Sequence, residues 1–225
     1  MRAYGHDRHA YSDRYEAGTE LATRLSRYRD RDDVVVLALP RGGVPVGYEV
    51  ARALNAPLDV FIVRKLGVPG HRELAMGAIA SGGVRVLNDD VVTWYRILES
   101  VIDEVAREEQ SELERRERAY RDGRAPVDLQ DRIVLLVDDG LATGSTMKAA
   151  VHAVRTHAPY RVIVAAPVGA PDTCLALRQT ADEVVCVRTP ESFAAVGQWY
   201  RDFSETSDAE VYELLRKRPA MAGRM

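Results

Sequence analysis

The chain has 225 residues, of which 46% are hydrophobic, so it can bury the core of one large domain with appendages or of a tight pair of domains. Its 31 basic and 34 acidic side chains leave a formal net charge of −3 and are interspersed along the sequence. A dedicated nucleic-acid binder would usually carry a strong basic excess, so we expect no nucleic-acid partner. No apolar run reaches the roughly 20 residues of a membrane helix, and residues 1–15 lack the apolar core of a signal peptide. These features predict a cytoplasmic protein with no membrane partner.

Apolar strands alternate with helical segments through most of the chain. Strongly apolar runs predict buried strands at residues 34–39, 58–63, 133–137, 161–167 and 183–187. Helices are expected at residues 15–29, from Gly43 to about Leu54, and at 145–157, 172–180 and 208–216. This alternation is typical of an α/β fold, a mostly parallel twisted sheet flanked by helices. Ligands bind such sheets at the carboxyl ends of the strands.

Two regions interrupt the alternation. Residues 64–77 are rich in Gly, Pro and charge, which predicts a loop, followed by short strands at 78–80 and 84–87. Residues 89–121 have a helical pattern whose second half is almost entirely charged, with pairs such as Glu112/Arg116 and Glu117/Arg121 at i,i+4 spacing. A solvated helix fits this pattern, and so does a projecting arm that pairs with another subunit of a homodimer.

The segment from Val134 to Met147 carries the strongest chemical signal. A buried strand is followed by the carboxylates Asp138 and Asp139, then by a turn of small residues and a helix that opens with two hydroxyls. Small residues and a helix N-terminus together present backbone N–H groups to a phosphate. Carboxylates beside such a cradle suit a ligand that also offers hydroxyls or Mg²⁺, as a sugar phosphate bearing pyrophosphate does.

Three other interpretations of these glycine-rich segments are weaker. A Walker A loop needs Lys directly before the Ser/Thr, where this chain has Gly144. A dinucleotide-binding fingerprint at residues 42–47 would need Gly at position 44, which is Val44. A purely structural turn would rarely combine two acids, several small residues and two hydroxyls.

The segment from Val134 to Met147 resembles the 5-phosphoribosyl 1-pyrophosphate (PRPP) motif of type I phosphoribosyltransferases. Residues 37–54 resemble the pyrophosphate loop and its helix, 61–80 the strand and mobile catalytic loop, and 194–203 the Val-Gly segment beside the nucleobase. The whole chain resembles the stand-alone bacterial group of these enzymes. The resemblance implies one domain over residues 1–225 with a core at about 33–203 and a helical insertion at about 89–121. It also implies a small hood, formed by about 12–30, by about 191–218 or by both.

The resemblance also implies roles for individual residues. Asp138 and Asp139 would hold the ribose hydroxyls and organise Mg²⁺ indirectly, through PRPP and water. The 5′-phosphate would be held by Ala142, Thr143, Gly144, Ser145 and Thr146. The pyrophosphate would meet Arg41, Gly42 and Gly43, with a cis peptide bond between Pro40 and Arg41.

Two further pairs have two interpretations each. Arg64 and Lys65 either clamp the leaving pyrophosphate together with Arg41 or are solvated charges at a strand end. Phe193 and Trp199 either stack on a flat base or pack against the sheet edge.

The mechanism implied by the resemblance is transfer of the phosphoribosyl group from Mg²⁺-bound PRPP to a nitrogen acceptor, a nucleobase or related heterocycle. Ala142 occupies the position of an acid in the hypoxanthine/guanine enzymes, which predicts that 6-oxopurines are poor acceptors. The alternatives are a regulator that senses PRPP or a nucleotide without turnover, an RNA-binding attenuation protein on this fold, and a sugar-phosphate enzyme of another class.

Overall fold

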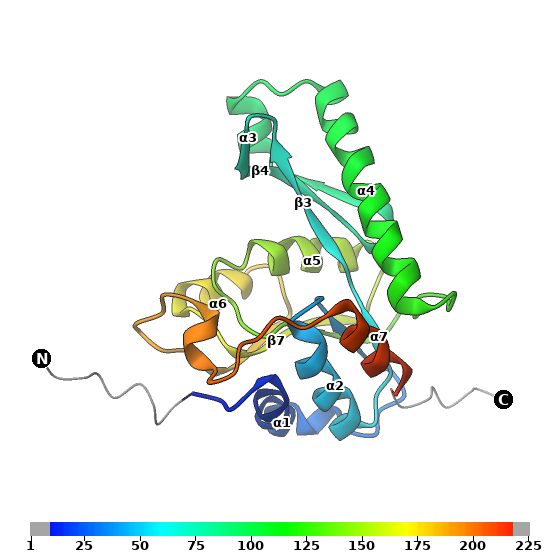
Figure 1. Cartoon of the computed structure of the whole chain (residues 1–225), viewed down its shortest axis with the longest axis vertical. Helices are drawn as coiled ribbons and strands as arrows, with labels where there is room; N and C mark the ends of the chain where they lie inside the picture. Colours follow the sequence, from blue (N-terminus) through cyan, green and yellow to red (C-terminus); the bar gives the residue numbers. More distant parts are fainter. Residues whose placement is uncertain (1–9, 218–225) are drawn as a thin grey trace, which may run out of the picture.

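The computed structural model describes residues 10–217, and its centre is a five-stranded parallel sheet (Figure 1). The strand order is β2-β1-β6-β7-β8, with β1 at Val34–Ala38, β2 at Leu58–Val60, β6 at Ile133–Val137, β7 at Arg161–Val168 and β8 at Glu183–Arg188. All neighbouring strands are parallel, which confirms the predicted α/β architecture. The carboxyl ends of β1 and β6 lie side by side, because Ala38 pairs with Val137.

Helices cover both faces of this sheet (Figure 1). One face carries α1 (Arg14–Arg24), α2 (Gly43–Leu54) and α7 (Asp208–Arg216), and the other carries α5 (Ser145–Arg155) and α6 (Pro171–Leu177). Successive strand residues alternate between the two cores, so that Val34 and Val36 pack on the α1/α2 side and Val35 on the α5/α6 side. Short 3-10 helices lie at Ser26–Tyr28, Ser81–Gly83 and Val196–Trp199.

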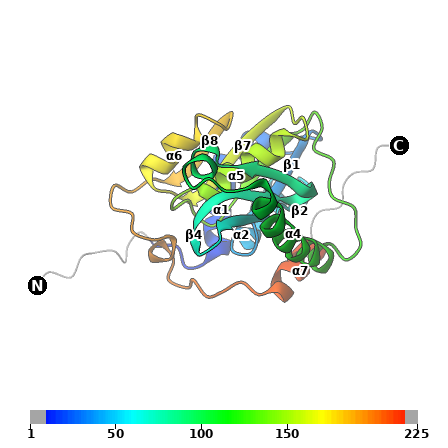
Figure 2. The ribbon, with the colours of Figure 1, turned by 90° about the horizontal axis from the view of Figure 1, so that it is seen from above.

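A second, antiparallel sheet projects from the first and carries two helices (Figure 1). It consists of β3 (Val63–Val68), β4 (His71–Ala80) and β5 (Val84–Leu87), followed by α3 (Asp89–Trp94) and α4 (Glu99–Arg121). We call residues 63–121 the arm. Seen from above, the arm lies across α5 (Figure 2).

The prediction of a loop at residues 64–77 is wrong, because these residues form the β3–β4 ribbon. Leu66 and Met76 are fully buried and pack in one cluster with Ile102 and Leu113 of α4, so the ribbon has an apolar face. Pro69 and Gly70 make only the turn, where Gly70 has a φ of 80°. The expected strand at 58–63 is likewise shorter, because the Ile62 backbone N–H donates to the Ser81 hydroxyl of the arm rather than extending β2.

The single helix expected at residues 89–121 is two helices. Arg96 adopts a left-handed φ of 50°, which separates α3 from α4. The charged half of α4 is not wholly solvated, because Leu113 and Tyr120 are buried on its inner face. Within residues 10–217, no helix has both the length and the apolar character that crossing a membrane requires.

Candidate active site

The acidic pair lies at the carboxyl end of β6, on the loop that leads into α5. Burial, together with the neighbouring charge of Asp139, raises the pKa of Asp138 well above its ordinary value. Burial also raises the pKa of Asp139, against the opposing effect of the Arg14 guanidinium. The Oδ1 atom of Asp138 accepts the backbone N–H of Asp139 at 2.9 Å, which fixes the turn. Two carboxyl groups thus share a site that resists their ionisation.

The loop after β1 packs directly against this pair. A Cβ atom at Gly42 would overlap the Oδ2 atom of Asp139, and one at Gly43 would lie 2.8 Å from the carbonyl oxygen of Val137. Glycine at both positions therefore lets the two loops touch. The peptide bond between Pro40 and Arg41 is cis, as the resemblance implies.

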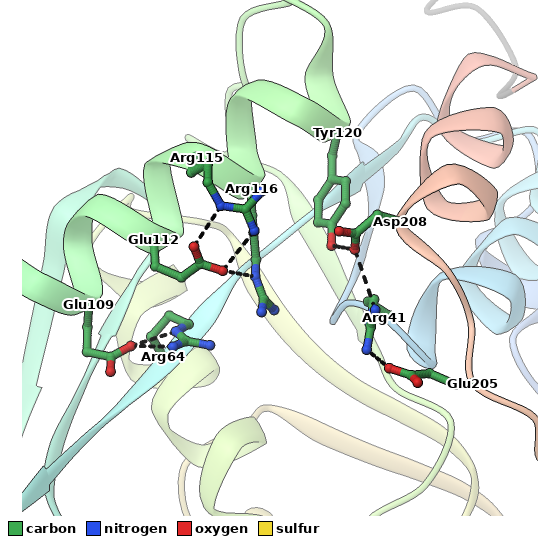
Figure 3. Close-up of polar contacts among 9 residues, drawn as sticks. All are labelled: Arg41, Arg64, Glu109, Glu112, Arg115, Arg116, Tyr120, Glu205 and Asp208. Atoms are coloured by element: carbon green, nitrogen blue, oxygen red, sulfur yellow. Dashed lines mark hydrogen bonds and ion pairs between the residues drawn. The ribbon is translucent and has the colours of Figure 1, made fainter.

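Arg41 reaches from this loop to the chain segment that precedes and opens α7. It forms ion pairs with Glu205 and with Asp208, the latter at 3.7 Å between Nη1 and Oδ1 (Figure 3). The Asp208 carboxylate also accepts a 2.6 Å hydrogen bond from the Tyr120 hydroxyl of α4. No local pattern in the sequence points to these partners, because they come from distant segments.

The loop from Leu141 to Gly144 has the shape of a phosphate cradle. Leu141 is buried and bridges to Gly169, whereas Ala142 and Thr143 are exposed. Gly144 adopts a φ of 71° at the N-cap of α5, so the chain turns sharply into the helix. Within the described chain, the amides of Thr143, Gly144 and Thr146 donate no hydrogen bond to protein, and so they can donate to a ligand.

The hydroxyls and the back of this loop are also arranged. Thr143 Oγ1 and Ser145 Oγ lie 3.3 Å apart, and the side chain of Thr146 is exposed beside them at the start of α5. From behind, the Thr173 hydroxyl of α6 donates to the Ala142 carbonyl oxygen at 2.5 Å. Hydroxyl-bearing and small side chains therefore surround the N-terminus of α5.

Arg14, which the sequence did not single out, joins the acidic pair from α1. Its Nε atom donates to Asp139 Oδ2 at 2.9 Å, its Nη1 atom donates to the Ser204 carbonyl oxygen at 2.7 Å, and its guanidinium lies 4.0 Å from the ring centre of Phe203. The Tyr200 hydroxyl donates to the backbone carbonyl oxygen of Asp139 at 2.5 Å. Segments from both ends of the described chain therefore meet at Asp139.

Arg64 and Lys65 do not act from one face of the ribbon. Successive residues of a strand point to opposite sides, and Arg64 points to α4, where it forms a 2.6 Å ion pair with Glu109 (Figure 3). Lys65 is exposed on the other side of β3. Arg64 therefore contacts α4, and so does Asp208, which accepts the Tyr120 hydrogen bond. Through Asp208, the same helix is linked to Arg41.

Phe193 and Trp199 pack against a small apolar cluster of Tyr11, Val168 and Tyr200 at the edge of the site. This contact fits the packing interpretation, and stacking on a base stays a prediction. The indole Nε1 of Trp199 is buried and has no hydrogen-bond partner among residues 10–217. A buried N–H without an acceptor is costly in a folded protein, so this group is unsatisfied as the described residues stand.

The residues of the site offer two carboxylates rather than a closed metal cage. Among the described residues, no group of three or more His, Cys, Asp or Glu side chains is placed to hold a metal ion. Asp138 and Asp139 offer hard oxygen atoms that accept hydrogen bonds from the water shell of a Mg²⁺ ion whose other ligands are substrate phosphates. The donor set therefore fits Mg²⁺ that arrives with a phosphorylated substrate.

Comparisons with known proteins agree with this geometry. Two Mycobacterium tuberculosis proteins, from strains CDC 1551 and H37Rv and named provisionally as phosphoribosyl transferases, are 51% identical to the chain over 205 residues. The match covers 91% of this chain but 46% of theirs, so the chain spans less than half the length of these relatives. The crystal structure of TT1426 from Thermus thermophilus is 41% identical, with a TM-score of 0.82 over 94% of this chain and 100% of that one. The family model of the phosphoribosyl transferase domain matches residues 9–203, and the chain belongs to the type I phosphoribosyltransferase family.

Proposed function

We propose that this protein transfers the 5-phosphoribosyl group of PRPP to a nitrogen acceptor and releases pyrophosphate. The observation that carries the proposal is the contact between three parts of one site. The acidic pair adjoins the phosphate cradle along the chain, and Asp139 packs on Gly42 of the loop that presents Arg41. A ribose whose hydroxyls face the acids would have its 5′-phosphate toward the cradle and its pyrophosphate toward Arg41.

The cradle would bind the 5′-phosphate through the backbone and hydroxyls of residues 142–146. The helix dipole of α5 contributes only about 0.3–1 kcal/mol, so most of the affinity would come from direct hydrogen bonds. Asp138 and Asp139 would accept hydrogen bonds from the ribose hydroxyls. Mg²⁺, held by substrate oxygens and water near these carboxylates, would neutralise charge on the departing pyrophosphate.

The leaving pyrophosphate would be stabilised by Arg41, with Arg64 approaching from the arm on the side of α4. A role for Lys65, on the other side of β3, stays a prediction from the resemblance. Displacement at the anomeric carbon needs no covalent enzyme intermediate, so the protein mainly positions the reactants and stabilises developing charge. Arg41 is held by two carboxylates in this structure, Glu205 and Asp208. A pyrophosphate would replace at least one of them as the partner of Arg41.

The acceptor would lie beside Phe193 and Trp199. The indole N–H of Trp199, unpaired within residues 10–217, supports this placement, since a heterocycle could accept its hydrogen bond. Ala142 can neither accept nor relay a proton from the acceptor. We therefore expect a 6-aminopurine or a non-purine nitrogen heterocycle to be preferred over 6-oxopurines.

The test is steady-state turnover with PRPP, Mg²⁺ and a panel of adenine, hypoxanthine, guanine, xanthine, uracil and orotate. Pyrophosphate release should be fastest with adenine, uracil or orotate, the members of the panel that are not 6-oxopurines. The highest kcat/KM with hypoxanthine or guanine would contradict the Ala142 argument. PRPP binding without turnover on any base would favour the alternative function, a sensor of PRPP or a nucleotide on the same fold.

We also propose that the protein works as a homodimer joined through the arm. Trp94 and Leu98, at the junction of α3 and α4, are 83% and 68% exposed, and Tyr95 between them is 50% exposed. Contiguous exposed apolar side chains mark interaction surfaces in soluble proteins. These residues lie at the end of the arm away from the parallel sheet (Figure 1).

A further inference from the structure

The second half of α4 runs beside the edge of the sheet where the pyrophosphate loop begins. Arg121 fixes its C-terminal end, because this side chain donates to the Val60 carbonyl oxygen at 3.0 Å, at the last residue of β2. Tyr120 ties the same end to Asp208, which is an ion-pair partner of Arg41. Nearer to the N-terminus of the same helix, Glu109 forms an ion pair with Arg64 of β3. The helix α4 is therefore linked to both cations, to Arg64 directly and to Arg41 through Asp208.

Arg116 lies on the inner face of this stretch of α4. It stands three residues after Leu113 and four before Tyr120, a spacing that places all three on one side of a helix. Leu113 and Tyr120 are fully buried, and the Arg116 side chain is 28% exposed, against 73% for Arg118. Burial and the hydrogen bond to Asp208 raise the pKa of Tyr120, and the charges of Arg116 and Arg41 oppose this shift. Figure 3 shows its side chain leaving the helix on the side where Arg64 and Arg41 lie.

The guanidinium of Arg116 is only partly engaged. Its Nε atom donates to Glu112 Oε1 at 2.7 Å, and Glu112 is its one ion-pair partner in the described chain. By contrast, both the Nε and Nη2 atoms of Arg64 contact Glu109. The two terminal nitrogens of Arg116 are therefore available to an anion, in the fork geometry that suits phosphate oxygens.

Glu112 holds Arg116 in place through Nε and leaves its two terminal nitrogens without a bond to this carboxylate. Hydrogen bonds from Arg115 and Arg116 lower the pKa of Glu112 to about 2, so this carboxylate stays ionised at all working pH values. An inward-facing arginine whose Nε is fixed, and whose terminal nitrogens meet no acceptor among residues 10–217, is preorganised for a ligand.

We infer that Arg116 is a further cation of the pyrophosphate site, which donates from α4 to the leaving group beside Arg41 and Arg64. The inference rests on the proposed function and extends it, because it makes the arm helix part of the active site. Arg116 forms no covalent bond in this role; it binds pyrophosphate oxygens and stabilises their charge as the bond to the anomeric carbon breaks.

The test is calorimetric titration of the full chain with Mg²⁺-PRPP, with Mg²⁺-pyrophosphate and with ribose 5-phosphate. Arg116→Gln should weaken PRPP and pyrophosphate binding by roughly ten-fold or more, as expected for the loss of a charge-assisted hydrogen bond. Ribose 5-phosphate has no pyrophosphate, so its affinity should not change. Arg118→Gln is the matched control, since Arg118 is on the same helix, pairs with Glu114 at 3.7 Å and faces solvent; it should match the wild type with all three ligands.

Arg116→Lys guards against a folding defect, because it keeps the charge and most of the packing. It should fold with an unchanged melting temperature and show an intermediate loss of pyrophosphate affinity, since a lysine cannot form the fork. Wild-type pyrophosphate affinity in both variants would overturn the inference, as would an equal loss for ribose 5-phosphate, which would indicate a structural role. A wild-type protein that binds no PRPP would instead refute the proposed function, and the inference with it.

Discussion

Asp138 and Asp139 are placed where their charge is unfavourable for folding. Both are partly or wholly withdrawn from water, they repel one another, and Arg14 is the cation within hydrogen-bonding distance among the described residues. A carboxylate whose pKa is raised by burial destabilises the native state once it ionises. Such a pair is expected where a ligand that brings hydroxyls and Mg²⁺ supplies the missing partners.

We predict that Asp138→Asn stabilises the fold and abolishes Mg²⁺-dependent PRPP binding. The amide keeps the oxygen that accepts the Asp139 N–H and removes a buried charge, so the free energy of unfolding at neutral pH should rise by on the order of 1 kcal/mol. Urea denaturation and calorimetric titration measure the two effects. A variant that loses stability, or that binds PRPP as the wild type does, would contradict the assignment.

The raised pKa of Asp138 also makes the stability difference between the wild type and Asp138→Asn depend on pH. Between the unfolded-state pKa of about 3.9 and the raised native value, the native state binds more protons than the unfolded state. The stability of the wild type should therefore fall, relative to Asp138→Asn, as pH rises through this window. Denaturation curves at several pH values should show the two proteins converging only at low pH.

Residues of the site could be predicted where they are contiguous in sequence. The acids, the cradle and the Arg41 loop follow buried strands, and their order alone indicates a phosphate and hydroxyl site. Arg14 could not be found in this way, because it lies 125 positions from Asp139 and follows an ordinary helix cap at Asp13. The same holds for Glu205 and Asp208, whose partner Arg41 is far away in sequence.

At the scale of elements, the β3–β4 ribbon is the main departure from expectation. Residues 64–77 contain glycine, proline and charge, which favour a loop when each residue is judged alone. The ribbon forms because Leu66 and Met76 gain a buried surface on α4, and this surface exists only once residues 99–121 have folded against it. Local propensity is overridden here by a tertiary contact.

The element-scale link that matters most to the site is the hydrogen bond between α4 and α7. We predict that Tyr120→Phe, which removes the 2.6 Å bond to Asp208, lowers the free energy of unfolding by roughly 1–2 kcal/mol. It should also increase hydrogen exchange at the start of α7, since Asp208 would lose its tie to α4 and keep its contact with Arg41.

The control is Tyr212→Phe. The Tyr212 hydroxyl donates to Asp122 at 3.0 Å, but this bond is exposed to solvent, so its loss should change stability by much less. Because Asp122 is the C-cap of α4, this bond also joins α7 to α4. Equal effects of the two substitutions would show that the bond from Tyr120 to Asp208 has no special importance among these links.

At the scale of the whole molecule, the parallel sheet could be predicted because each strand is a continuous apolar run, the pattern of strands buried on both faces. The projection of the arm could not, since it depends on which apolar faces meet. The charged second half of α4 concealed two widely spaced residues of its inner face, Leu113 and Tyr120.

The proposed dimer gives a prediction at this scale. Trp94→Glu with Leu98→Glu should convert a dimer to a monomer in light scattering after size exclusion, because two charges would replace exposed apolar contacts. Leu175→Glu is the control, since Leu175 is 61% exposed on α6, away from the arm, and should leave the mass unchanged. A monomeric wild type, or a double variant that remains dimeric, would rule out the arm as the interface.

The pairing of Arg41 with Glu205 and Asp208 also has a consequence for synthesis. Translation is vectorial, so the nascent chain emerges with Arg41 and Arg64 long before the ribosome adds the carboxylates that balance Arg41. Until residues 205–208 are made, Arg41 has neither of these two carboxylates as a partner. The ion pairs of Arg41 therefore form only after one of the last described segments has left the ribosome.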